Sequence, residues 1–245
     1  MTNNSYRDRI YQNYASKFQN TGPEFDVSAS LRWGRAYTFY LRGWLPKNKD
    51  AAVLDAACGG GRLLHFYKEA GLSQISGVDV SPEQICLARQ ITPNVFEENV
   101  LTHLRNNPER FDLISGFDII EHLTKQEVLD FLDAAYAALR PNGRLILQTP
   151  NADSLAGMSI RYGDFTHEVC FNAQSLSRLM KLVGFNTIEA RETGPILWGY
   201  SMASTARWLV WSCLRALTQL FNYAEVGSPG SGITTRVFLI TGLKG

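Results

Sequence analysis

The sequence predicts an α/β fold in which a doubly wound, mostly parallel sheet of seven strands carries helices on both faces. Three observations predict it. Short apolar runs alternate with amphipathic stretches along residues 51–150, the first run ends at the glycine-rich turn DAACGGG (55–61), and the alternation resumes between residues 173 and 242. Parallel strands need crossover helices between them, and these helices cover both faces of the sheet.

Local signals delimit the elements of residues 51–150. The first helix closes at Gly71, the second begins with Ser81 as its cap and Pro82 in its first turn, and the last stops at Pro141 and Gly143. The apolar runs between them are of strand length. The predicted strands span 51–57, 74–80, 94–99, 111–117 and 144–150, and the predicted helices span 61–71, 81–91, 101–107 and 124–140.

Further elements precede and follow this alternation. Residues 1–22 and 28–45 are predicted to form two helices that make an N-terminal cap, the second ending before Pro46. No internal repeat or proline-rich linker marks a second domain, so we expect one domain over residues 1–245. The elements predicted after Pro150 are a helix at 173–184, a strand at 185–191, a long helix from about Ser201 to Tyr223 and a strand at 234–242.

Charge and cysteine usage narrow the function classes. The net charge is +1 and no basic tract interrupts the chain, which disfavours a nucleic-acid substrate. The N-terminus lacks the apolar stretch of a signal peptide, so we expect a cytoplasmic protein. The cysteines lie far apart without a C-x-x-C pair, which predicts neither a disulfide framework nor a zinc site. They are Cys58, Cys86, Cys170 and Cys213.

The glycine-rich turn does not match the common phosphate-binding loops. A G-x-G-x-x-G motif would need glycine at 57 and 62, where the chain has Ala57 and Arg62, and no G-K-[ST] follows. The turn does follow an acid, Asp55, and a second acid, Asp79, ends the next strand. A carboxylate there can accept two hydrogen bonds from the hydroxyls of a ribose. We therefore expect a nucleoside ligand without a pyrophosphate.

Four stretches carry a resemblance to a known family. VLDAACGGGRLL, GVDVSPEQICLAR, FDLISGFDIIEHL and LRPNGRLILQTPN resemble, in order and spacing, the motifs of class I S-adenosylmethionine-dependent methyltransferases. The branch they resemble includes ubiquinone-pathway O-methyltransferases and bacterial glycan-cluster (O-antigen and capsule) methyltransferases. The resemblance covers about 53–190, and it implies a cofactor-binding half at 46–150 and an acceptor-side half at 151–245.

The resemblance implies S-adenosylmethionine as cofactor. In it, Asp79 would hold the ribose, Val80 would flank the adenine, and two positions depart from the pattern: Ala57 replaces a glycine and Asn99 an aspartate. We expect alanine to permit close approach unless its φ is positive, and the asparagine oxygen to accept a hydrogen bond. Tyr11 and Tyr14 are lid candidates, as is Arg35. The implied cofactor contacts are Arg35, Asp55, Ala57, Gly59, Gly61, Asp79, Val80, Asn99, Gly116 and Phe117.

A hydroxyl acceptor needs a base, and two histidines qualify by position. His122 follows the fourth strand, and His167 lies in RYGDFTHE (161–168), which resembles an insert of the glycan-cluster enzymes. Asp164 or Glu168 could orient His167, and Arg161 could meet a phosphate or a uronic carboxylate. The other interpretation is a capping loop in which Asn172 or Thr166 starts a helix. The sequence leaves both open.

A second cluster raises the question of a metal. Asp118, Glu121 and His122 have i, i+3, i+4 spacing and share a face if a helical turn forms. The group resembles the acid-x-x-Glu-His set that carries a divalent metal in ubiquinone-pathway enzymes. An ordinary hydrogen-bonded cluster is the favoured alternative, so no metal ligand is assigned.

The last helix is amphipathic. Over 204–225 an apolar arc opposes a polar face that carries Arg207 and Arg215, and we expect the arc to be core or dimer contact. Trp208 and Trp211 lie on the polar side and could touch a sugar, a lipid carrier at the inner face of a membrane, or a partner. The arginines exclude a membrane span.

The expected function is an S-adenosylmethionine-dependent O-methyltransferase acting on a hydroxyl of a sugar or surface-glycan precursor, which could be lipid-linked, with His167 or His122 as base. One alternative is a phenolic or quinone-precursor O-methyltransferase assisted by a divalent metal. Another is a non-catalytic cofactor-binding interaction protein, motivated by Ala57 and Asn99. The sequence does not reveal the oligomeric state.

Overall fold

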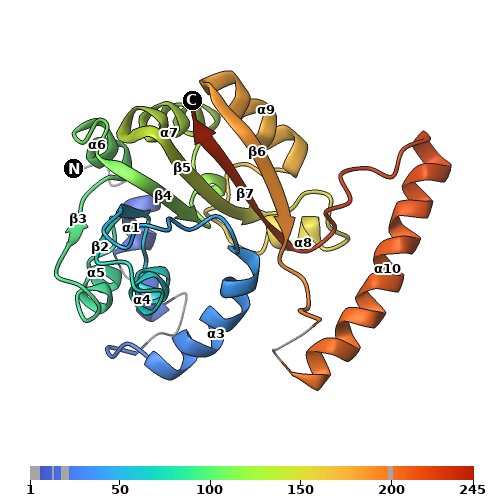
Figure 1. The fold of residues 1–245 in the computed structure, drawn as a ribbon, viewed down its shortest axis with the longest axis horizontal. Helices are drawn as coiled ribbons and strands as arrows, with labels where there is room; N and C mark the ends of the chain where they lie inside the picture. The colour runs from blue at the N-terminus through green and yellow to red at the C-terminus, as the bar shows by residue number, and fades with distance from the viewer. Residues whose placement is uncertain (1–5, 13, 18–21, 198–200) are drawn as a thin grey trace.

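The computed structural model describes residues 6–12, 14–17, 22–197 and 201–245, and its centre is a seven-stranded sheet (Figure 1). The strand order is β3-β2-β1-β4-β5-β7-β6, and only β7 runs antiparallel to its neighbours, which confirms the mostly parallel sheet. The strands are β1 (Ala52–Ala56), β2 (Gln74–Asp79), β3 (Val95–Glu97), β4 (Phe111–Phe117), β5 (Leu139–Pro150), β6 (Phe185–Glu192) and β7 (Val237–Lys244).

Helices cover both faces of the sheet. One apolar core, with Leu104, Phe131 and Leu176, lies under α6, α7 and α9, and the other, with Tyr37 and Ile85, lies under α3, α4 and α5. The helices are α1 (Tyr6–Tyr11), α2 (Tyr14–Lys17), α3 (Val27–Tyr40), α4 (Arg62–Glu69), α5 (Pro82–Ala88), α6 (Val100–Arg105), the 3₁₀ helix η1 (Ile120–His122), α7 (Lys125–Ala138), α8 (Gly157–Arg161), α9 (Ala173–Val183) and α10 (Met202–Val226).

The order of the strands reverses at β1, which pairs in parallel with β2 on one side and β4 on the other. Consecutive β1 residues serve opposite faces: Val53 packs in one core and Leu54 in the other. At such a switch point the connections leave in opposite directions and open a crevice at the carboxyl ends of the strands. The functional side chains are therefore expected at this edge.

Several predicted boundaries shift for local reasons. The second predicted helix ends at Tyr40 rather than 45, and the helix predicted to reach 140 ends at Ala138, because the chain there already enters β5 at Leu139. Within the described part of 1–22 there are two short helices in place of one. The sequence missed α8 and η1, both too short to show a periodic pattern.

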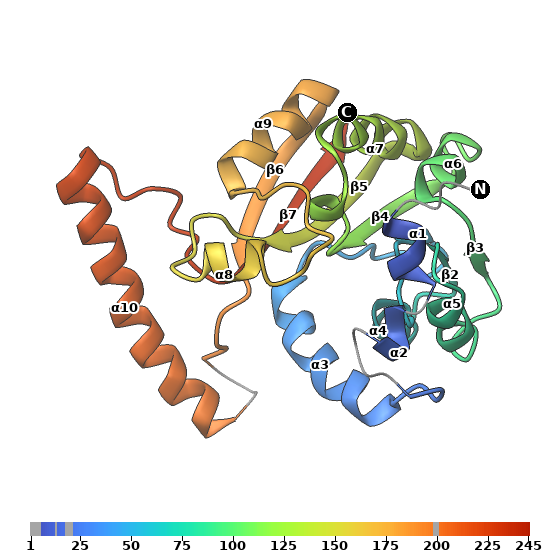
Figure 2. The ribbon, with the colours of Figure 1, turned by 180° about the vertical axis from the view of Figure 1, so that it is seen from behind.

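The long helix α10 stands apart from the sheet in both views (Figures 1 and 2). Its apolar arc points to solvent, with Leu217 63% and Leu220 64% exposed, so the expectation of a core position is wrong. Trp208 and Trp211 are half-buried on the side that faces the body. Among the described helices, none is long and apolar enough to cross a membrane.

Candidate active site

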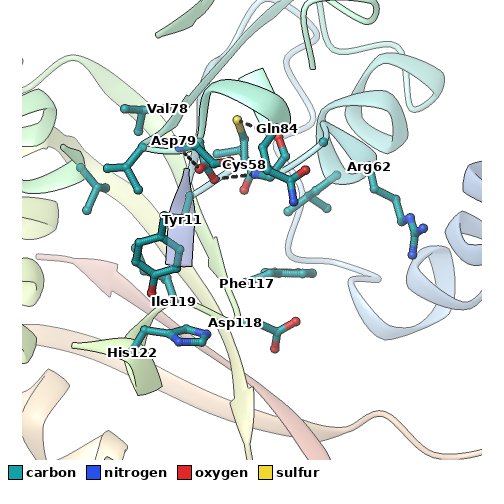
Figure 3. A pocket seen from close by; sticks show the side chains of 18 of the residues that line it. Tyr11, Cys58, Arg62, Val78, Asp79, Gln84, Phe117, Asp118, Ile119 and His122 are labelled. Carbon is teal, nitrogen blue, oxygen red and sulfur yellow. Dashed lines mark hydrogen bonds between the residues drawn. The ribbon is translucent and has the colours of Figure 1, made fainter. Parts of the chain in front are cut away.

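A cavity of about 1510 Å³ opens at the carboxyl ends of β1, β2 and β4 (Figure 3). Its walls come from the turns after these strands, from the N-terminal segment through Arg7 and Tyr11, and from the loop that carries Asp164 and His167. Ligand pockets commonly measure roughly 300–1,000 Å³. The cavity therefore has room for a nucleoside-sized ligand and a second small molecule together.

The turn after β1 brings bare backbone to the cavity wall. Ala57 and Gly59 both have left-handed backbones, with φ of 61° and 50°. A Cβ at Gly60 would lie 3.1 Å from Oε1 of Gln84, so the turn packs closely on α5. The condition under which alanine is costly is thus met at position 57, where the left-handed conformation costs a non-glycine residue about 1–2 kcal/mol.

Asp79, at the end of β2, holds this turn in place. Its Oδ2 accepts a hydrogen bond from the Gly59 amide and its Oδ1 accepts one from the Ser81 amide, both at 2.9 Å (Figure 3). Each carboxylate oxygen keeps a second lone pair, and the side chain lines the cavity. Burial raises the pKa of Asp79. The carboxylate can accept two more hydrogen bonds, as a ribose would supply.

Asp55, at the end of β1, is the second acid of the cavity and is only 2% exposed. The Ser115 hydroxyl donates to its Oδ1 at 2.8 Å. Burial raises the pKa of Asp55 to about 7, and the charge of Asp79 adds to the rise. A carboxylate in this position is poised to ionise when a cation binds beside it.

Most of the expected cofactor residues line the cavity, and three do not. Gly61 turns the chain into α4, and Gly116 is packed inside β4, where a Cβ would lie 3.1 Å from Ile119 and Leu147. Arg35 is exposed on α3 and is not part of the cavity wall in the described structure. Those that line it are Asp55, Ala57, Gly59, Asp79, Val80, Asn99 and Phe117.

Two polar groups fit the cofactor that the resemblance implies. The Ser81 hydroxyl is buried at the cavity wall beside Asp79 and has no hydrogen-bond partner among the described residues. Asn99 caps α6: its Oδ1 accepts from the Leu101 amide at 2.9 Å and from the Thr102 amide at 3.4 Å. Its amide nitrogen, rather than the oxygen we expected, is therefore the group it offers to a ligand.

On the opposite wall a chain of hydrogen bonds leads to His122. The Thr166 hydroxyl donates to Asp164 Oδ1 at 2.6 Å and lies 2.8 Å from His122 Nδ1. Because that hydroxyl has one proton, Nδ1 must donate to it, and Nε2 of His122 keeps a free lone pair. Burial and the neighbouring His167 lower the pKa of His122 to about 4, so the ring is neutral at pH 7.

His167 lies next to His122, with ring centroids 4.8 Å apart. Its Nδ1 lies 3.1 Å from the backbone oxygen of Ile160, an acceptor only, so Nδ1 carries the proton and Nε2 is free. The expected pairing is thus corrected: Asp164 orients His122 through Thr166, whereas a backbone carbonyl orients His167. Both histidines line the cavity.

Glu168 and Arg161 make contacts other than those that the sequence predicted. The Glu168 carboxylate accepts from Tyr6 and lies 3.7 Å from Arg7, and it is not part of the cavity wall in the described structure. Arg161 directs its guanidinium at the backbone oxygens of His167 and Glu168. Arg161 therefore stabilises the loop that carries His167, and neither Arg161 nor Glu168 has the role expected for it.

In the described part of the chain, the side chains that could hold a metal are not the Asp118–Glu121–His122 set that the sequence raised as a less favoured alternative. Asp118 has φ of 54° and binds the Gln148 amide at 3.0 Å. Among the described residues, Glu121, His122 and His167 instead place one ligand atom each within 4.8 Å of one another. Burial raises the pKa of Glu121 well above its ordinary value, and the charge of Asp118 adds to it. A cation in this trio would be offered two imidazole nitrogens and a carboxylate.

Three side chains at or behind the cavity wall were not predicted from the sequence: Trp33, Tyr37 and Gln148. Tyr37 donates to Gln148 Oε1, which turns the Gln148 amide toward Asp118. Tyr37 also stacks on Trp33 at 3.8 Å, and the Phe117 ring lies 5.6 Å away. Gln148 was visible as a polar residue at the end of an apolar strand, whereas the aromatic wall gave no signal distinct from core packing.

Of the two tyrosines proposed as lid residues, the structure places Tyr11 at the cavity. Tyr11 lines the cavity, as His122 does (Figure 3). Burial raises the pKa of Tyr11 to about 12. Arg7 pairs with Glu127 at 2.8 Å and so ties α1 to α7 across the cavity. The side chain of Tyr14 lies outside what the structure describes.

Comparisons with known proteins show the family to which the chain belongs. A family model for a methyltransferase domain matches residues 29–190, which includes α3 beyond the expected stretch. A ubiquinone biosynthesis O-methyltransferase from Haemophilus ducreyi is 30% identical over 121 residues, 45% of this chain and 50% of that protein. A mitochondrial one from Schizosaccharomyces pombe is 24% identical over 205 residues, 76% and 67% of the two chains. The chain thus spans about half the length of the bacterial relatives it matches.

Solved structures share the fold. A SAM-dependent methyltransferase from Archaeoglobus fulgidus superposes with a TM-score of 0.64 at 19% identity, covering 94% of this chain and 98% of that one. Phosphoethanolamine N-methyltransferase 2 from Haemonchus contortus, solved with S-adenosyl-L-methionine, gives 0.56 at 15% identity, covering 96% and 60%. The matched motifs, the polar groups around Asp79 and these relatives agree: the chain belongs to the methyltransferase domain family, within the class I S-adenosylmethionine-dependent methyltransferases.

Proposed function

We propose that the protein transfers the methyl group of S-adenosylmethionine to a hydroxyl oxygen of a small-molecule acceptor, with His122 as general base. The observation that carries the proposal is the Asp164–Thr166–His122 chain, which leaves a neutral imidazole with a free Nε2 at the wall of the cavity. The cofactor supplies a methyl carbon on a cationic sulfur, which leaves as a neutral thioether.

The residues divide the work between two walls of the cavity. Asp79 and Ser81 hold the nucleoside, and Asp55 faces its cationic end. As the acceptor oxygen bonds to the methyl carbon its proton becomes strongly acidic, and Nε2 of His122 takes it. Because the oxygen is acidified as it reacts, a base whose pKa is about 4 suffices. Tyr11 and the Arg7–Glu127 pair cover this wall and exclude water.

For the acceptor, the surroundings favour a phenolic hydroxyl over the sugar hydroxyl that the sequence favoured. The segment around Asp164 exposes bulky apolar side chains, Leu155 at 89%, Met158 at 70% and Phe165 at 81%, although these three are not part of the described cavity wall. Arg161, the group expected to meet a phosphate or uronate, is committed to backbone oxygens. The matched relatives from Haemophilus ducreyi and Schizosaccharomyces pombe are named for ubiquinone biosynthesis, which supports the same class.

A labelled-methyl transfer assay against catechols, nucleotide sugars and lipid-linked glycans tests the proposal. We expect label in a catechol, and His122→Ala to lower kcat by roughly 10²–10⁴-fold with unchanged affinity for S-adenosylhomocysteine. His167→Ala is the matched control, with a smaller loss. Label in a glycan alone would overturn the acceptor class, and an unchanged kcat in His122→Ala would overturn the base.

The Glu121–His122–His167 trio favours a second candidate, the same transfer assisted by a divalent metal. A metal there would bind the acceptor oxygen and lower its pKa. Calorimetric titration of the protein with Zn²⁺ or Mn²⁺, without acceptor, should show one site that Glu121→Gln abolishes. Full activity after dialysis against a chelator, together with no binding in that titration, would exclude this candidate.

A further inference from the structure

The face by which α10 contacts the body is its polar one. Arg215 pairs with Glu192 at 3.1 Å, and the Ser204 hydroxyl donates to the Ile196 backbone oxygen at 2.8 Å. A Cβ at Gly194 would lie 3.3 Å from the Trp211 indole nitrogen, so this ring also packs on the 192–196 segment. These contacts fix the rotation of the helix and turn its apolar arc outward.

The outward arc of α10 is continuous and carries no charged residue. Projected at 100° per residue, it is about 140° wide, and its large members are each about half exposed or more: Leu209 57%, Val210 62%, Leu214 49%, Leu217 63%, Leu220 64% and Phe221 66%. A helix of 25 residues is about 37 Å long, so the arc offers roughly 600 Å². Monomeric proteins rarely leave so large an apolar patch uncovered.

We propose that this arc is the interface of a two-fold symmetric dimer, in which the α10 helices of two copies of the chain pack antiparallel. Two arcs of this size bury about 1,200 Å² in total, the lower limit for a stable interface. A two-fold axis makes the patch its own partner, so one apolar face on one chain suffices. The proposal is independent of the acceptor and of the catalytic base.

Charge at the edge of the arc supports this occupant. Arg207 near the start of α10 and Glu225 near its end lie on the same edge of the helix, because the 18 residues between these positions make five full turns. Antiparallel pairing brings Arg207 of one copy toward Glu225 of the other, whereas parallel pairing would put the charged edges of the two helices on opposite sides of the interface, where these charges do not pair. Helices that lie on a membrane instead carry many Lys and Arg on the polar face, and here Arg215 is already paired with Glu192.

Cys213 provides a reporter for this geometry. It is exposed, lies near the centre line of the arc and is one residue from the midpoint of Met202–Val226. A two-fold axis through the arc therefore brings the two Cys213 side chains together. A short bis-maleimide should link the dimer covalently, Cys213→Ser should abolish the link, and Cys86→Ser, at an exposed cysteine on α5, should leave it unchanged.

The decisive experiment measures mass in solution for the intact chain by sedimentation equilibrium. We expect twice the 27.4 kDa of the chain, and we expect Leu217→Glu to raise the dimer dissociation constant by about 100-fold, because each dimer would bury two carboxylates. Leu182→Glu is the matched control, since Leu182 on α9 is 74% exposed and lies outside the arc. Arg207→Glu should weaken the dimer, and adding Glu225→Arg should restore it.

A monomer at 50–100 μM, on the order of a hundred times a typical functional dissociation constant, would overturn the proposal. So would a chain that floats with phosphatidylglycerol vesicles but does not self-associate, which would assign the arc to a membrane. If Leu217→Glu fails to fold, as judged by circular dichroism, the bis-maleimide link at Cys213 in the unaltered chain decides: its absence overturns the dimer, and its presence supports it.

Discussion

The two walls of the cavity are built in different ways. The cofactor wall is made by the ends of two neighbouring parallel strands, with Asp55 near the end of β1 and Asp79 at the end of β2. Asp79 accepts from the amide of Ser81 beside it and from the amide of Gly59 in the turn after β1. The acceptor wall joins η1 to a loop 44 residues further on, through Thr166 and His122. The first wall is local and carried by backbone geometry, whereas the second depends on side chains that only the folded chain brings together.

If the cofactor wall depends on Asp79, removing that carboxylate should have the largest effect. Asp79→Ala should weaken binding of S-adenosylhomocysteine by roughly 100- to 1,000-fold in calorimetry, since two charge-assisted hydrogen bonds to the ligand are lost and the Gly59 and Ser81 amides lose their acceptor. Asp133→Ala, at an exposed acid on α7, is the control. A change of less than three-fold would show that the carboxylate does not bind the ligand.

Removing one hydroxyl from the acceptor wall should lower the rate of methyl transfer without changing cofactor affinity. Thr166→Val removes the hydroxyl between Asp164 and His122, so we expect kcat to fall roughly 10- to 100-fold while KM and affinity for S-adenosylhomocysteine stay within two-fold. Thr166→Ser should restore most of the rate. Thr38→Val, which alters a hydroxyl bound to its own helix, should change nothing. Equal losses in rate and cofactor affinity would instead mean that the two walls act as one.

The pH dependence of cofactor binding should sharpen the role of Asp55. Its pKa is raised to about 7, so its ionised fraction, and with it the affinity for the ammonium of S-adenosylhomocysteine, should rise about ten-fold between pH 6 and pH 8. The same raised pKa means that Asp55 contributes fully to the stability of the ligand-free fold below about pH 4, the ordinary pKa of an aspartate, and that this contribution is lost as pH rises to about 7. Asp55→Asn should flatten both dependences; a slope that persists in this variant would assign it to another group.

The smallest effect concerns the turn itself. Ala57→Gly should raise the free energy of unfolding by up to about 1 kcal/mol, because relief of the left-handed alanine exceeds the extra entropy that glycine brings to the unfolded chain. That corresponds to about 2–4 °C in thermal unfolding. Affinity for S-adenosylhomocysteine should stay within two-fold. A lower melting temperature would show that the alanine methyl packs usefully against its neighbours.

The same contrast explains what the sequence could predict. The order of strands and helices, the glycine turn and Asp79 follow from periodicity and from spacing within single βα units, and all of them hold in the structure. Gly116 was included among the predicted cofactor contacts because of its place in the motif. In the structure, the lack of a side chain at this position leaves room for Leu147. Motif position alone does not distinguish a residue that touches a ligand from one that makes space for a neighbour.

The contacts of the acceptor wall were predicted less well, because they join residues that are far apart in the sequence. His167 and Glu168 adjoin in sequence, yet Glu168 bonds outward to Tyr6 and Asp164 serves His122. For α10 the amphipathic period was correct, but periodicity cannot say which face meets the body. The contacts of Ser204 and Arg215 with the 192–196 segment turn the polar face of α10 toward the body, although a helix usually buries its apolar face.

The place where α10 is inserted has a consequence of its own. The chain leaves the sheet at Glu192 and returns at Val237, and Glu192 is paired with Phe238, so the points of departure and return are neighbouring positions of one antiparallel hairpin. Glu192 also accepts from the Thr234 amide at 2.8 Å and closes the neck of the excursion. A whole helix can therefore be lengthened, exchanged or lost over evolutionary time, as a longer or shorter hairpin loop, without rethreading a single strand of the sheet that carries the chemistry.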